Sequence, residues 1–224
     1  MTPQRYQKLR RVLDSRQPDL TVLLDNVHKP HNFSAILRSC DAVGVFEAHA
    51  VWQDPKLRAN HLTSGGAAKW VRICTHPDIA TAVAELREQG FQLVAAHPQG
   101  DARDYRELDY THPTALLLGA ELQGLGKAAL EYADERVCVP MLGMVESLNV
   151  SVAAATILFE AQRQRINTNQ YAESRLDRAR YHRTLVEWAH PAVASYCRRH
   201  ALTYPDLDDD GEIVGPLPKS GGIV

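Results

Sequence analysis

Residues 135–165 read ERVCVPMLGMVESLNVSVAAATILFEAQRQR, and this stretch decides the architecture. Its opening residues form a short apolar run that is typical of a buried strand, here predicted at 136–139. A loop with several apolar side chains follows. Helical spacing then runs from Ser147 to Arg165. A buried strand that leads through a loop into a long helix is the repeating unit of an α/β sheet.

The same alternation continues toward the N-terminus. Strands are predicted at residues 20–27, 45–52, 70–74, 91–97 and 114–119, and helices at 33–44, 76–90 and 127–134. Strands that alternate with helices are typical of a parallel sheet covered on both faces. We therefore predict an α/β fold with a parallel sheet flanked by helices.

The chain divides into three parts on this pattern. The sheet-forming domain spans residues 20–165. A basic helix is predicted before it, within residues 1–19, and a helical extension with an acidic tail follows at 166–224. The main helix of that extension is predicted over 176–200, with a break at Pro191.

Composition narrows the class of protein. The 224 residues are 45% apolar and 23% charged, as in globular domains. The longest apolar run, at 150–159, is shorter than the roughly 18 residues of a membrane span, and the N-terminus lacks the apolar core of a signal peptide. We expect a soluble cytoplasmic protein with no membrane contact.

Cysteine and histidine spacing argues against a metal site. The four cysteines form no C-x-x-C pair, so we expect reduced thiols and no disulfide. His28 and His31 are the closest histidines, and Pro30 between them disfavours a helical pair of ligands.

Charge is unevenly distributed, although the formal net charge is only −2. The first 16 residues and residues 161–183 each carry a local charge of +4, whereas the tail from Asp206 to Glu212 is acidic. The two basic segments could form one nucleic-acid-binding surface, within one chain or across a dimer. Solvated helix faces are the alternative.

Three loops follow predicted strands, at the sheet edge where open α/β folds bind ligands. The first presents Asn32 in the approach to a helix that we expect to begin near Ser34, with Arg38 one turn inside it. The second, GAELQGLGKAALEYA at 119–133, presents Glu121. Its G-x-G-x-x-A text lies too far from the strand for a dinucleotide fingerprint, and no Ser or Thr follows the lysine as in a P-loop.

The third loop leads into the long helix. We expect Ser147 to cap that helix and Asn149 to lie in its first turn. Together the loops supply amide, guanidinium, carboxylate and hydroxyl groups, which bind and position a polar substrate such as ribose and phosphate. No nucleophile elbow is present.

At these loops the sequence resembles the SpoU branch of the SPOUT methyltransferases. The resemblance rests on NFSAILR at 32–38, LGAELQGL at 118–125 and VPMLGMVESLNVS at 139–151. It is strengthened by SRQPDLTV at 15–22, DNVHKPHN at 25–32, DAVGV at 41–45 and LFEAQRQR at 158–165.

The resemblance implies a C-terminal deep trefoil knot and a homodimer whose active site lies at the subunit interface, where the third-motif helix packs. It also implies S-adenosylmethionine as cofactor. Carried over by position, its contacts would come from Ala96, His97, Gly119, Val139, Met141 and Leu148.

The implied reaction transfers a methyl group to the ribose 2'-hydroxyl of guanosine 18 in the tRNA D-loop. The resemblance places Arg38 as the catalytic arginine, with Asn32, Glu121, Ser147 and Asn149 beside it. A guanidinium stays protonated at neutral pH, so a phosphate contact by Arg38 is as plausible as proton transfer to it. The implied tRNA contacts are Arg10, Arg11, His31, Arg163 and Arg165.

Three alternatives stay open. The chain could methylate ribosomal RNA, although only about 20 residues precede the first strand, where such relatives often carry an RNA-binding domain. It could be a non-catalytic RNA-binding protein of the same fold, or a methyltransferase for small molecules, in which the basic segments would have no purpose.

Overall fold

The computed structural model describes residues 1–52, 69–97, 101–121 and 123–217. It divides into two compact units, one formed by Met1–Arg16 with Tyr171–Val224 and the other by Gln17–Gln170. The first and last of the three expected parts therefore belong to one body. None of the helices in the described ranges has the length and hydrophobicity that a membrane crossing requires.

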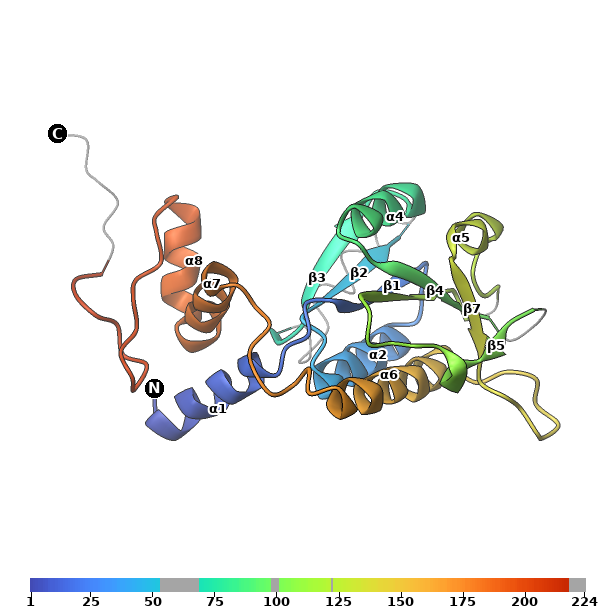
Figure 1. The fold of residues 1–224 in the computed structure, drawn as a ribbon. Helices are drawn as coiled ribbons and strands as arrows, with labels where there is room; N and C mark the ends of the chain where they lie inside the picture. The colour runs from blue at the N-terminus through green and yellow to red at the C-terminus, as the bar shows by residue number, and fades with distance from the viewer. Residues whose placement is uncertain (53–68, 98–100, 122, 218–224) are drawn as a thin grey trace. The chain divides into compact units, whose positions relative to one another are not determined.

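The larger unit is built on a parallel sheet of seven strands in the described residues, in the order β3-β2-β1-β6-β4-β7-β5 (Figure 1). The strands are β1 (Leu20–Asp25), β2 (Glu47–Val51), β3 (Arg72–His76), β4 (Gln92–Ala96), β5 (Arg103–Asp104), β6 (Thr114–Leu118) and β7 (Glu135–Cys138). Every neighbouring pair is parallel, which confirms the predicted α/β class. The sequence analysis missed β5, because two residues are too few to show a period.

Helices cover both faces of this sheet (Figure 1). On one face lie α2 (Pro30–Val43) and α6 (Val150–Asn167), and on the other α4 (Ile79–Glu88) and α5 (Lys127–Tyr132). Strand residues alternate between the two cores: Val22 packs with the α2 and α6 side, and Leu23 with the α4 and α5 side. Each fully buried aliphatic side chain contributes about 1.5–3 kcal/mol to the free energy of folding, so these two cores hold the strands and their ends rigidly.

Two helix starts differ from the prediction, and both matter for the site. Helix α2 begins at Pro30 rather than near Ser34, because proline is favourable where the first N–H has no helical partner. Asn32 therefore lies in the first turn, not in an approach loop. Helix α6 begins at Val150 rather than Ser147. The predicted end of α2 is confirmed, since Gly44 adopts a left-handed φ of 85°.

The smaller unit packs α1 (Pro3–Asp14) against α7 (Arg178–Ala189), with α8 (Pro191–Arg199) beside α7. Its hydrogen bonds link the two ends of the chain: the Tyr181 hydroxyl donates to Asp14 at 2.7 Å. The helix break predicted at Pro191 is confirmed, because Pro191 begins α8. The chain's N-terminal amino group also meets Glu212 of the acidic tail at 3.2 Å.

Candidate active site

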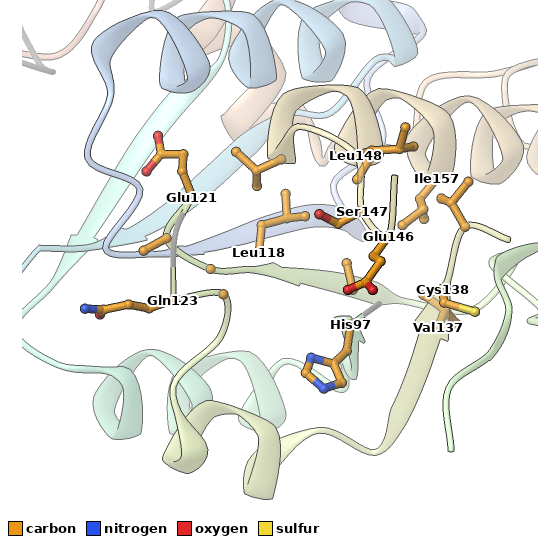
Figure 2. A pocket seen from close by; sticks show the side chains of 17 residues that line it. His97, Leu118, Glu121, Gln123, Val137, Cys138, Glu146, Ser147, Leu148 and Ile157 are labelled. Atoms are coloured by element: carbon orange, nitrogen blue, oxygen red, sulfur yellow. The ribbon is translucent and has the colours of Figure 1, made fainter. Parts of the chain in front are cut away.

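A cavity of about 410 Å³ opens beyond the carboxyl ends of β4, β6 and β7 (Figure 2). Much of its wall is apolar, including Leu118, Val137 and Ile157, and carboxylates of Glu121 and Glu146 also line it. A crevice of this size at the strand ends of an open α/β sheet is the expected place for a small-molecule ligand.

The cavity brings together most of the residues expected to hold a cofactor. Those that line it are Ala96, His97, Gly119, Val139 and Leu148, together with Glu121 and Ser147 from the catalytic set. Met141 is half-buried in the loop after Pro140 and does not line the cavity. Sequence reasoning missed Gln123, Cys138 and Glu146 as wall residues, although Gln123 and Glu146 stand inside the loops that it singled out and Cys138 ends strand β7.

Gly119 lets the loop after β6 fold tightly against itself. A Cβ added at Gly119 would lie 2.1 Å from the carbonyl carbon of Gly124 and 2.2 Å from the Leu125 nitrogen. The Gly124 N–H donates to the Ala120 carbonyl at 2.8 Å, which holds the turn. The glycines therefore serve a close backbone approach, in agreement with the rejection of both phosphate-loop patterns.

Glu121 connects the three motif loops through hydrogen bonds. Its Oε1 accepts from Asn32 Nδ2 at 2.8 Å, and Asn32 Oδ1 in turn accepts from Asn149 Nδ2 at 3.2 Å. The backbone N–H groups of Lys29 and His28 also donate to the carboxylate, at 3.0 and 3.3 Å. The carboxylate thus satisfies free N–H groups at the start of α2.

The pKa of Glu121 is lowered by this environment. Burial raises it, but hydrogen bonds from Asn32 and from backbone N–H groups of the loop lower it by more. The group is therefore an ionised acceptor near neutral pH, which suits it to hold the first-motif loop rather than to donate a proton.

Asn149, not Ser147, caps the third-motif helix. Its Oδ1 accepts from the Ser151 N–H at 2.8 Å and from the Ser151 hydroxyl at 2.7 Å. The expectation of a Ser147 cap was wrong, because the helix starts three residues later and leaves Ser147 exposed on the cavity wall. Asn149 consequently joins helix capping to the Glu121 network.

Arg38 lies apart from this network. It is exposed on α2, does not line the cavity, and makes no ion pair with any residue that the structure describes. Asn32, by contrast, is 2% exposed, and both of its polar atoms bond within the protein. Within a single chain, the structure therefore brings together Glu121, Asn32 and Asn149 but leaves Arg38 facing outward.

The residues expected to contact RNA fall into two groups. Arg11, His31 and Arg163 are exposed and Arg10 is half-buried beside Tyr181, with Arg163 paired to Glu160 at 2.7 Å.

The structure contradicts the expectation that Arg165 contacts RNA. Its side chain is 0% exposed, and it donates to Asp19 Oδ1 at 2.6 Å and to the carbonyl oxygens of Tyr110 and His112, both at 2.9 Å. All three guanidinium nitrogens bond inside the protein, so this arginine joins α6 to the start of β1 and does not face a phosphate.

Family models match most of the chain. The SpoU rRNA Methylase family matches residues 19–159, and a SpoU rRNA methylase C-terminal model matches residues 163–216. The first range contains every element that forms the cavity.

Named relatives point in the same direction. The chain is 48% identical over 215 residues to a tRNA (guanosine(18)-2'-O)-methyltransferase of Escherichia coli K12, covering 95% of this chain and 94% of that protein. It resembles the crystal structure of the Aquifex aeolicus TrmH/SpoU tRNA modifying enzyme with a TM-score of 0.76 and 41% identity, over 84% of this chain and 96% of the other. It also resembles the SpoU methyltransferase AviRb of Streptomyces viridochromogenes in complex with AdoMet, at a TM-score of 0.57 and 32% identity, over 69% and 62% of the two chains.

Proposed function

The chain belongs to the SpoU rRNA methylase family, and from this premise we propose that it transfers the methyl group of S-adenosylmethionine to the ribose 2'-hydroxyl of guanosine 18 in the tRNA D-loop. One observation carries the proposal: residues of the second and third motifs line one cavity at the strand ends, and hydrogen bonds of Asn32 with Glu121 and Asn149 tie the first motif to both.

The cavity fits S-adenosylmethionine in size and chemistry. Its volume of about 410 Å³ lies in the range of small-molecule sites. Apolar walls suit an adenine ring, and Glu146 on the cavity wall favours the positive charge of a sulfonium. The bound cofactor supplies a methyl group on sulfur, a bond that breaks readily as the new carbon–oxygen bond forms.

The protein must align the 2'-hydroxyl with the methyl group and provide for the departure of one proton. A methyl group transferred to the 2'-oxygen requires in-line attack, to which precise positioning contributes most. The proton of the hydroxyl must leave at the same time, either to an Arg38 that has first given up its own proton or to a phosphate that Arg38 holds. Asn32, Glu121 and Asn149 act as positioning residues for the first-motif loop, and Ser147 faces the substrate from the cavity wall.

tRNA would be held by basic side chains that are exposed or half-buried. We propose phosphate contacts for Arg10, Arg11, His31 and Arg163, and none for Arg165, whose guanidinium is buried. A tRNA substrate also supports our proposal that the protein acts in the cytoplasm.

A second copy of the chain would complete the site. Val152, Phe159 and Ile166 are about half exposed and recur every seven residues, so they share one face of α6. Leu142 and Met144, in the loop before that helix, are almost fully exposed. Several large apolar side chains exposed on one helix face and in the loop before it are typical of an interface, and a homodimer through α6 would bring a partner's residues toward the cavity.

We further propose that the chain forms a trefoil knot around the cavity. Strand β6 lies between β1 and β4, β7 lies beyond β4, and α6 then returns to pack against α2.

The decisive assay supplies labelled S-adenosylmethionine with unmodified tRNA transcripts, one carrying the ordinary D-loop guanosine and one carrying 2'-deoxyguanosine at that position. Label is expected in the first transcript and not in the second. Label in both would exclude this acceptor atom, and label only in ribosomal RNA would assign the rRNA alternative. Cofactor binding without transfer to any RNA would favour the RNA-binding alternative.

A further inference from the structure

A second cluster of chemically active side chains lies on β2 and β3, at the other edge of the sheet from the cavity strands. Glu47 and His49 stand two residues apart on β2, and Cys74 is the direct partner of His49 in the parallel register. One ligand atom from each lies within 4.8 Å of those of the other two. Glu47 is 7% exposed and His49 is 1% exposed, so this is an interior group.

A relay of side chains fixes the His49 ring. His49 Nδ1 lies 2.8 Å from His76 Nε2, and His76 Nδ1 lies 3.6 Å from the Glu85 carboxylate on α4. A proton on His76 Nδ1, facing Glu85, leaves His76 Nε2 free to accept from His49 Nδ1–H.

This arrangement leaves an unused lone pair in the protein interior. With its proton on Nδ1, His49 carries the lone pair on Nε2, and that atom is buried without a hydrogen-bond partner in the described residues. A buried acceptor without a partner is unfavourable, and native proteins rarely leave one so. A cation bound by Nε2 would satisfy it.

We propose that Glu47, His49 and Cys74 bind a Zn²⁺ ion. Carboxylate, imidazole and thiolate are the ligand types that zinc takes in proteins, at about 2.0–2.3 Å. Ligand atoms of a tetrahedral site lie roughly 3.3–3.8 Å apart, so a small inward movement suffices. Binding releases the Cys74 thiol proton to solvent, and the thiolate and the Glu47 carboxylate then balance the ion's two charges.

The side chains around the three proposed ligands resemble those that orient the ligands in known kinds of zinc site. Zinc-bound histidines usually donate their other N–H to a carboxylate or another acceptor, and His76, with Glu85 behind it, is positioned to be that acceptor for His49 Nδ1. Arg72 Nη1 lies 3.9 Å from Glu47 Oε2, a contact that a carboxylate with two oxygens can keep while it binds an ion. The ion would cross-link the edge strand β3 to β2.

The first test uses the intact, untagged protein, stripped with a chelator and titrated with Co²⁺ and then Zn²⁺. We expect one equivalent per chain, a thiolate-to-cobalt charge-transfer band in the near ultraviolet, and loss of that band as Zn²⁺ displaces Co²⁺. Failure to bind one equivalent, or cobalt binding without the thiolate band, would overturn the proposal. Neither result bears on the methyl-transfer cavity, which shares no residue with this cluster.

Matched variants locate the site. Cys74→Ser is expected to abolish the band and weaken zinc binding at least tenfold, whereas Cys138→Ser, another half-buried thiol, should keep both. The same response in both variants would refute the assignment.

His76 gives a test of positioning. His76→Ala should weaken zinc binding about 10- to 100-fold. His76→Gln should restore most of that affinity, because its side-chain oxygen can accept from His49 Nδ1–H. Equal losses in the two variants would contradict the relay.

Discussion

At the scale of single residues, Glu121 is the group on which the proposed site depends most. One carboxylate accepts hydrogen bonds from the side chain of Asn32 and from two backbone N–H groups, and Asn32 passes the connection to Asn149. Hydrogen bonds to a charged acceptor are stronger than neutral ones. Three loops far apart in the sequence are thus held by one side chain.

Glu121→Gln should make that contribution measurable through pH. The pKa of Glu121 is lowered in the folded protein, so its stabilisation is complete above the unfolded value of about 4.3 and is lost as the pH falls through the folded pKa. We expect the variant to lose about 1–3 kcal/mol of unfolding free energy at pH 7. The unfolding free energy of the variant should also decline less steeply than that of the wild type as the pH falls. Urea unfolding at neutral and acidic pH tests this, and parallel pH profiles would contradict it.

Arg38→Ala should lower kcat by about 100-fold or more, since proton handling and phosphate contacts act in the transition state. Binding of S-adenosylmethionine should be unchanged, because Arg38 does not line the cavity. Arg38→Lys separates the two roles: a phosphate contact keeps part of the activity with lysine, although not the bidentate geometry. Near-normal turnover of the alanine variant would remove Arg38 from the mechanism.

Arg163 and Arg165 should behave oppositely, although they stand two residues apart. Arg163→Ala is expected to raise the KM for tRNA and reduce the salt dependence of binding by about one phosphate contact, with stability nearly unchanged. Arg165→Ala should cost about 3–5 kcal/mol of unfolding free energy, because it removes the buried guanidinium that pairs with the half-buried Asp19. Urea unfolding measures the stability of each variant, and tRNA binding at several salt concentrations measures its phosphate contacts. A loss of stability in Arg163→Ala with a loss of tRNA binding in Arg165→Ala alone would refute these two roles.

At the scale of elements, short turns between rigid strands and helices place the chemistry. The turn after β6 is possible only because Gly119 has no Cβ, and the loop before α6 ends where Asn149 caps the helix. Both features lie at ends of elements that are anchored in the core.

Gly119→Ala should disrupt the cavity, because its Cβ would overlap backbone atoms that cannot move aside. We expect a loss of about 1–3 kcal/mol or more in unfolding free energy, with loss of cofactor binding. Gly143→Ala is the control, since a Cβ there meets nothing within 4 Å and its φ is not in the left-handed region. Calorimetric binding of S-adenosylmethionine distinguishes them; a binding-competent Gly119→Ala protein would contradict the close approach.

At the scale of the whole molecule, the proposed dimer accounts for the apolar face of α6 and for the separation of Arg38 from the cavity. A charge introduced at the centre of that face should prevent assembly, because an unpaired carboxylate would have to be buried. Phe159→Asp is therefore expected to give a monomer that no longer transfers methyl groups.

Val214→Asp is the matched control for that substitution. Val214 is 56% exposed, against 49% for Phe159, but lies in the smaller unit. Light scattering after size exclusion gives the mass of each variant. A dimeric Phe159→Asp protein would place the interface elsewhere, and a monomeric Val214→Asp protein would show that the effect is not specific to α6.

The sequence by itself determined the class of fold and indicated which loops supply the candidate site. Buried strands and amphipathic helices leave a local period of apolar residues, so the alternation from residue 20 to residue 165 predicted a parallel sheet. The ordered motifs likewise selected Asn32, Glu121 and Asn149 before their contacts were known.

Only the tertiary structure decided which of these side chains meet and which face solvent. Arg163 and Arg165 look alike in sequence, yet packing against Asp19 buries one and leaves the other outside. The same holds for His49 and Cys74, 25 positions apart, which the register of β2 and β3 makes neighbours. Local periodicity is encoded over a few residues, whereas burial, capping and pairing depend on contacts between distant segments, which form only when the chain folds.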